Sequence, residues 1–151
     1  MRKHLTKLHE SFYAKKGFFL IPKNMVPILA ISSGAILGAL LRFWLGSMLN
    51  SSFPTIPLGT LIANLLGGFL MGTFMALTRN HTYLSETLRL AIATGFLGSL
   101  TTFSTFSGET MTLLMHHEYF WGSLMILAHV AGSLFCTLIG IYTIRLIEVI
   151  L

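Results

Sequence analysis

The sequence predicts an all-α integral membrane protein with four transmembrane helices, the third of which is broken in mid-membrane. Of the 151 residues, 54% are hydrophobic and 10% are charged, and the mean hydropathy is +0.76. Soluble domains normally carry about 25% charged residues. Four apolar stretches are each long enough to cross a hydrocarbon core of about 30 Å. The third stretch is interrupted by glycine and hydroxyl residues.

The expected spans are joined by short connections and form one transmembrane channel domain, residues 25–151. In chain order they lie at residues 25–49, 58–78, 87–115 and 120–147. In the first span, Gly34 and Gly38 lie four residues apart, so they form a small face that another helix can approach closely. One such chain makes a thin bundle, and we therefore expect it to oligomerise.

The residues before the first span, 1–24, form a basic tail that holds six of the ten lysine and arginine residues. The net charge of +5 is therefore better explained by contact with membrane lipid than by nucleic-acid binding. With four spans, both termini and the 79–89 link lie on one side, which also carries nearly all of the basic residues. The positive-inside rule then predicts that both termini are cytoplasmic.

The third span is interrupted around residues 98–102, within a stretch rich in glycine, serine and threonine. This composition at membrane depth predicts a helix that breaks and exposes main-chain groups to something other than lipid. A cluster of freed carbonyl groups suits a hard monovalent cation. A packing kink filled by a neighbouring helix explains the same residues equally well.

Phe103 and Phe106 follow the break and share one helical face. Phenylalanines in such a helix usually pack in the core or face lipid, but here they are flanked by hydroxyl groups. A phenyl ring has a partly positive edge. Two such edges, with hydroxyl and amide donors, can therefore hold a small anion without a full positive charge.

Several polar residues lie inside the apolar spans. The side-chain amide of Asn64 lies at mid-span and needs a hydrogen-bond partner, which is either a group on another helix or an anion. Arg42 and Glu109 should each be paired, hydrated or close to the interface, because a charge facing lipid is costly. Span four carries three more polar residues that line either a polar track or an interhelical contact: His129, Ser133 and Thr137.

The sequence contains no arrangement typical of an enzyme. It lacks a recognisable nucleophile with its base, a phosphate-binding loop and a nucleotide fingerprint. His116, His117 and Glu118 are adjacent, which indicates a solvated turn rather than metal ligands on a helix. The single Cys136 lies in an apolar run and has no partner for an intrachain disulfide.

The sequence contains three distinctive motifs: Gly38-x-x-x-Arg42, Gly59-Thr-Leu-x-x-Asn64 and Gly95-Phe-x-Gly-x-x-Thr-Thr-Phe-Ser-Thr-Phe106. Together they closely resemble those of the Fluc (CrcB-type) fluoride channel family. The last is long and specific, and the resemblance covers about residues 27–146. It implies a passive, fluoride-selective channel of the cell (inner) membrane that exports fluoride from the cytoplasm and lowers its toxicity. It also implies an antiparallel dimer with two pores.

The resemblance also assigns roles by position. It places seven residues beside the fluoride path: Asn64, Phe103, Phe106, Ser104, Thr105, Ser133 and Glu109. It matches the main-chain carbonyls of Gly98 and Thr101 to ligands of a central structural sodium ion shared by both subunits. Neutral donors suit fluoride because they repay part of its dehydration without trapping the ion.

The charge distribution leaves the dimer partner open. An antiparallel homodimer requires the same chain to insert in both directions, whereas this sequence is strongly biased towards one. The chain therefore forms either a homodimer despite the bias or a heterodimer with an oppositely oriented paralogue. Ser99 stands where many family members have glycine, which leaves the Gly98 carbonyl assignment intact.

Two other functions compete with the channel. A small four-span proton-coupled exporter of cationic compounds needs a carboxylate within the membrane, for which Glu109 is the candidate. A non-transporting assembly subunit predicts no ion flux and tolerates substitution of Phe103 and Phe106. We expect both phenylalanines to be required for fluoride flux.

Overall fold

The computed structural model describes residues 25–53, 55–80 and 84–150, and these residues form a bundle of four long helical segments. The predicted basic tail lies outside the described residues. The first, second and fourth segments are single helices: α2 (Val26–Leu49), α3 (Leu58–Asn80) and α7 (Tyr119–Ile150). A short 3₁₀ turn, η1 (Asn50–Ser52), follows α2.

The third segment is assembled from four consecutive pieces. They are α4 (Glu86–Arg89), the π-helical η2 (Leu90–Leu97), α5 (Gly98–Leu100) and α6 (Phe103–Met115). Each of the four segments is long and apolar enough to cross a membrane, so the chain is a multi-pass membrane protein. The predicted all-helical, four-span fold is confirmed.

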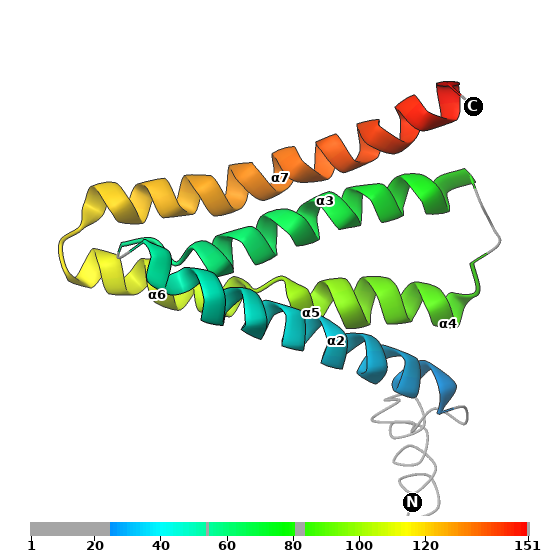
Figure 1. The fold of residues 1–151 in the computed structure, drawn as a ribbon, viewed down its shortest axis with the longest axis horizontal. Coiled ribbons are helices and arrows are strands. Elements are labelled where there is room, and N and C mark those ends of the chain that lie inside the picture. The colour runs from blue at the N-terminus through cyan, green and yellow to red at the C-terminus, as the bar shows by residue number, and fades with distance from the viewer. Residues whose placement is uncertain (1–24, 54, 81–83, 151) are drawn as a thin grey trace, which may run out of the picture.

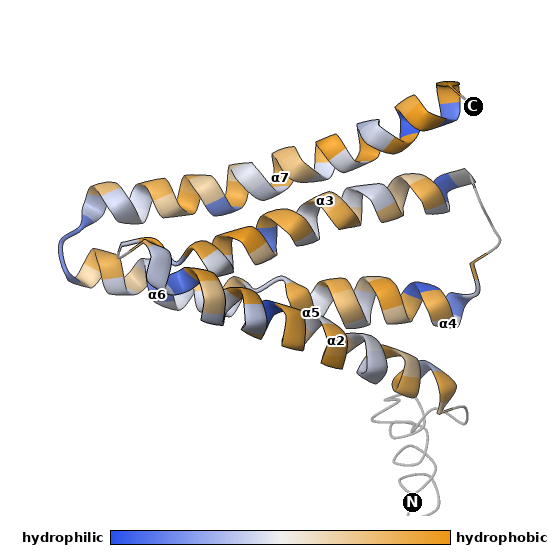
Figure 2. Ribbon diagram, in the orientation of Figure 1, coloured by the Kyte–Doolittle hydropathy of each residue, from blue (hydrophilic) through white to orange (hydrophobic). Residues whose placement is uncertain are grey.

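The outer surface of the bundle is apolar. Hydrophobic colour dominates the four segments, while the connection between α6 and α7 is hydrophilic (Figure 2). Large side chains on this surface are exposed, among them Leu29, Phe43 and Phe135 at 63%, 73% and 64%. Such exposure is normal where lipid replaces water, because apolar side chains then need no protein cover.

The helices pack as two pairs (Figure 1): α3 runs along α7, and α2 lies against η2 and α5. A small core joins the pairs where α2, α3 and α5 meet. Its buried residues are Leu45, Ala63 and Leu100. The break in the third segment follows Leu100 directly, so the core positions it beside α3.

The glycine face predicted on the first span is confirmed as a site of close helix approach. A Cβ atom added at Gly34 would collide with the carbonyl oxygen of Ala91, and one added at Gly38 with that of Phe96. The face therefore packs inside the chain, against η2. It brings the main chain of the third segment close to α2 just before the break.

The third segment breaks at Thr101 and Thr102, within the predicted range. Both residues are extended, with φ/ψ of −78°/150° at Thr101 and −143°/117° at Thr102. The π-helical η2 precedes the break, and at its end the Gly98 N–H reaches the carbonyl of Ala93, five residues back. The helix thus widens and then stops, which frees main-chain groups near the middle of the span.

Candidate functional site

The side-chain amide of Asn64 forms two hydrogen bonds with the main chain at the break. Its Oδ1 accepts a hydrogen bond of 2.7 Å from the Thr102 N–H, and its Nδ2 donates one of 3.0 Å to the Thr102 carbonyl. Asn64 is 9% exposed and Thr102 is 7% exposed. Because a main-chain N–H can only donate, this pair of bonds fixes which way the amide points.

Thr102 also caps the helix that follows. Its Oγ1 accepts from the Thr105 N–H at 3.2 Å and donates to the Thr105 hydroxyl at 2.9 Å. The Ser104 hydroxyl lies 3.3 Å from the same oxygen. This N-cap starts α6 immediately after the two extended residues. The predicted residues Ser104 and Thr105 are therefore held beside the break.

His129 of α7 joins this network through Asn64. Its Nδ1 lies 2.9 Å from Asn64 Nδ2. Since Nδ2 donates, Nδ1 must accept, and the neutral imidazole then carries its proton on Nε2. The residue is 4% exposed, and Nε2 is buried without a hydrogen-bond partner among the described residues. The site therefore contains a buried N–H donor that the described part of the chain leaves unused.

Phe106 and Phe103 extend a series of ring contacts from His129 to the surface of the chain. The Phe106 ring stacks on the His129 ring, with centroids 4.6 Å apart and an interplanar angle of 27°. Phe103 meets Phe106 edge to face at 5.5 Å and 68°. Phe106 is 7% exposed, whereas Phe103 is 77% exposed. The pair thus runs from the buried network to the open surface of the chain.

A cavity of about 420 Å³ lies between α3, the break and α7. It brings together most of the predicted site residues: Asn64, Gly98, Thr101, Phe103, Phe106 and Ser133, with His129 and Thr137. Ser133 is half-buried, and its hydroxyl makes no hydrogen bond with the described residues. The cavity lining is mainly apolar and includes a few neutral polar side chains, as in many small-ligand sites.

A second hollow of about 440 Å³ lies between α2, the start of α3 and the start of α6. Its lining includes Arg42, Thr60 and Thr105. Thr102 lines both this hollow and the cavity. The break is therefore the wall that the two spaces share.

Glu109 and Ser104 lie beside these spaces rather than in their linings. The Thr60 hydroxyl donates a hydrogen bond of 2.8 Å to Glu109 Oε1. The other carboxylate oxygen is buried and has no hydrogen-bond partner among the described residues. Ser104 is exposed and reaches the second hollow through its contact with Thr102.

The break redirects the hydrogen bonds that a continuous helix would make. The Thr102 N–H, the usual helical partner of the Gly98 carbonyl, donates to Asn64 instead. The Thr105 N–H, the usual partner of the Thr101 carbonyl, donates to the Thr102 hydroxyl. Arg42 Nε takes up a third freed carbonyl, that of Ser99, at 3.0 Å. Arg42 is thus paired inside the protein, one of the three situations expected for it.

The carbonyl oxygens of Gly98 and Thr101 are suitable ligands for a hard cation, but two ligands are too few to bind one. Carbonyl oxygens are suitable ligands for such an ion, and their helical donors are diverted. Two oxygens are too few to replace a hydration shell, so this chain supplies part of a site at most. Gly98 is exposed, so another group can approach it from outside the chain.

Some parts of the site were not recognisable as such in the sequence. Thr60 lies one helical turn before Asn64, and this spacing is the signal that places both on one face of α3. The role of Thr102 depends on the side chain of another helix, and no local pattern reveals it.

Comparison with known proteins identifies relatives over most of the chain. The family model described as CrcB-like protein, Camphor Resistance (CrcB), matches residues 29–141. This range contains the break, both phenylalanines and His129.

The relatives carry a common name, "Fluoride-specific ion channel FluC". The protein of Nitrosospira multiformis is 51% identical over 122 residues, which cover 81% of this chain and 95% of the relative. That of Nitrosomonas europaea is 50% identical over 118 residues, 78% of this chain and 93% of the relative. That of Pseudomonas paraeruginosa is 51% identical over 116 residues, 77% of this chain and 91% of the relative.

Proposed function

The chain belongs to the CrcB-like family, and we propose that it is a fluoride-selective channel through which fluoride leaves the cytoplasm passively. The observation that carries the proposal is the cavity beside the break, which neutral polar residues and two phenylalanines line together in a protein about 50% identical to named fluoride channels. The family consists of ion channels, which agrees with the prediction that the chain is not an enzyme.

Fluoride is small and strongly hydrated, so it enters a pore only where hydrogen-bond donors replace its water. The unused donors beside the cavity are the hydroxyl of Ser133 and the Nε2–H of His129, which is buried and reaches the ion only when the groups that cover it shift. Edges of Phe103 and Phe106 add weaker attraction. All of these groups are neutral, so the ion can leave as readily as it enters.

Asn64 serves this pathway chiefly by positioning. Both of its amide functions are engaged, with the main chain of Thr102 and with His129. It thereby holds the break open and keeps the histidine proton on Nε2. A direct contact between Asn64 and fluoride requires one of these bonds to be exchanged for the ion.

The second hollow supplies the continuation of the path on the other side of Thr102. Ser104 and Thr105 border the break there, and Thr60 anchors Glu109 at its edge. Thr105 and Thr60 line the hollow, and the Thr60 hydroxyl already donates to Glu109. Fluoride passing Thr102 thus moves from the cavity donors to a set of hydroxyl groups.

We also propose an antiparallel dimer with a structural sodium ion at its centre. Two carbonyls from Gly98 and Thr101 of each subunit provide four oxygen ligands, which one chain alone cannot do. The bound ion supplies fixed positive charge between the two pores. The 77% exposure of Phe103 supports the dimer, because a pore residue of this kind needs a further wall.

The charge distribution supports a placement in the cell (inner) membrane with both termini in the cytoplasm. Arg79, Arg89 and Arg145 lie at the end of the bundle where α3 ends, α4 begins and α7 ends (Figure 1). The positive-inside rule assigns this end to the cytoplasm. The partner in the dimer is then either a second copy inserted against the rule or an oppositely oriented paralogue.

The test is growth on fluoride of a bacterial strain whose own fluoride exporter has been deleted. Expression of the chain is expected to restore growth, and Phe106→Ile, present at an equal level in the membrane, is expected not to. If the chain fails to restore growth, it is expressed together with an oppositely oriented paralogue. Failure of both would overturn the proposal.

A further inference from the structure

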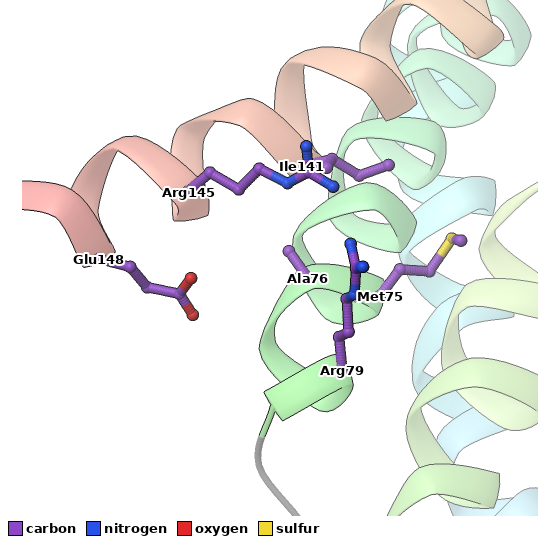
Figure 3. Close-up of a pocket in the computed structure, with 6 residues that line it drawn as sticks. All are labelled: Met75, Ala76, Arg79, Ile141, Arg145 and Glu148. Carbon is purple, nitrogen blue, oxygen red and sulfur yellow. The ribbon is translucent and has the colours of Figure 1, made fainter.

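A separate hollow lies between the C-terminal parts of α3 and α7. It has a volume of about 420 Å³ and is distinct from the two spaces at the helix break. The axes of α3 and α7 diverge towards this end (Figure 1). The hollow lies between them and is lined by Met75, Ala76 and Arg79 of α3 and by Ile141, Arg145 and Glu148 of α7 (Figure 3).

Its lining combines apolar side chains with two cations and one carboxylate, that of Glu148. Figure 3 shows the Arg145 side chain running along α7 beside Ile141, and the Arg79 side chain extending from the end of α3 towards α7. Within the described residues, the guanidinium groups of Arg79 and Arg145 make no hydrogen bond or ion pair. The Arg145 guanidinium lies over the Tyr142 ring, 5.8 Å from its centroid. Two guanidinium groups near one another repel unless an anion lies between them.

The position of the hollow relative to the membrane narrows the choice of anion. Arg79 is the last residue of the second span, and Arg145 lies near the end of the fourth. Both therefore sit at the depth where phospholipid phosphates meet the hydrocarbon, and the apolar wall faces the acyl region. A guanidinium binds phosphate through two parallel N–H donors.

We propose that this hollow binds one monoanionic phospholipid. The phosphate lies between Arg79 and Arg145, and the first acyl carbons lie on Met75 and Ile141. The carboxylate of Glu148 disfavours headgroups with further negative charge and can accept a hydrogen bond from a headgroup hydroxyl. Phosphatidylglycerol has this chemistry, with a single negative charge and two hydroxyl groups. Basic pockets between transmembrane helices are known to hold anionic headgroups.

The test is native mass spectrometry of the full chain in detergent, with equal amounts of phosphatidylglycerol and phosphatidylcholine. The protein is expected to retain phosphatidylglycerol preferentially. Each of Arg79→Gln and Arg145→Gln is expected to lower this preference about fivefold, and the double variant more. If the double variant aggregates, the single variants decide the result.

The double variant K15Q/K16Q is the control for net charge, because it removes two positive charges from the basic tail. It is expected to keep the preference. Equal loss in this control, or an unchanged preference in R79Q/R145Q, overturns the site. The readout is lipid retention, so the result is independent of whether the chain conducts fluoride.

Discussion

Asn64 and Thr102, which are 38 residues apart in the sequence, form two hydrogen bonds that join the middle of α3 to the break in the third span. The asparagine amide takes the place of the helical partners that the Thr102 main chain has lost. The same amide donates to His129 and thereby fixes the proton of the histidine on Nε2. One buried side chain thus determines both the shape of the break and the chemistry of the cavity.

Replacing Asn64 with Leu should destabilise the protein. The substitution leaves the N–H and carbonyl of Thr102 without their partner, at a cost of about 1–3 kcal/mol for each buried group. The measurement is the free energy of unfolding in mixed micelles. Thr143→Val is the control: it removes an exposed hydroxyl bond within α7 and should change stability by less than about 0.5 kcal/mol. Equal effects would contradict the structural role of Asn64.

Replacing His129 with Leu should slow fluoride efflux without preventing folding. The change removes the buried Nε2–H donor. Hydrogen bonds to charged groups contribute about 1.5–3 kcal/mol, which corresponds to a loss of about 10- to 100-fold in rate. Met125→Leu, a buried apolar exchange one turn earlier, is the matched control and should conduct normally. Normal efflux through the His129 variant would remove the histidine from the pathway.

Phe103→Ile should lower fluoride efflux while leaving the stability of the subunit nearly unchanged. The side chain is 77% exposed in the single chain, so its replacement should change the subunit's stability by less than about 0.5 kcal/mol. Fluoride efflux should nevertheless fall, because the ring edge that faces the path is lost. Phe106→Ile should lower both, since Phe106 is buried against His129. Efflux equal to that of the unmodified protein in both variants would contradict the pore assignment.

Gly38→Ala should destabilise the contact between α2 and η2. Its Cβ has no room beside the Phe96 carbonyl, which is main chain and cannot move aside on its own. Overpacking of this kind typically costs about 1–3 kcal/mol. Gly108→Ala in α6 is the control: a Cβ there meets no atom within 4 Å, so the variant should be as stable as the wild type or more stable. Unfolding of both variants in urea and detergent provides the comparison.

The general architecture could be predicted from the sequence because it depends on local properties. The lengths of the apolar runs define the spans, and the glycine and hydroxyl residues near Gly98 indicate the break. Gly34 and Gly38 predict a close helix contact from their spacing alone. These signals do not require knowledge of which helices meet.

The details of the site depend on tertiary contacts and could not be predicted. The sequence leaves Asn64 equally suited to a helix contact and to an anion, and only the alignment of α3 with the break reveals that its amide is engaged. The π-helical η2 depends on a shift in hydrogen-bond register that its apolar composition does not indicate. The donor on His129 follows from two successive contacts, neither of which is local in sequence.

The most direct test of the proposed channel is fluoride efflux from liposomes that contain the chain and are loaded with potassium fluoride. A fluoride electrode records release before and after addition of the potassium carrier valinomycin, with chloride-loaded liposomes as the control. We predict rapid efflux of fluoride, but not of chloride, that begins only when valinomycin balances the charge. If the chain is inactive alone, it is reconstituted with an oppositely oriented paralogue. Absence of fluoride efflux in both preparations, or efflux that does not depend on valinomycin, would contradict a passive fluoride channel.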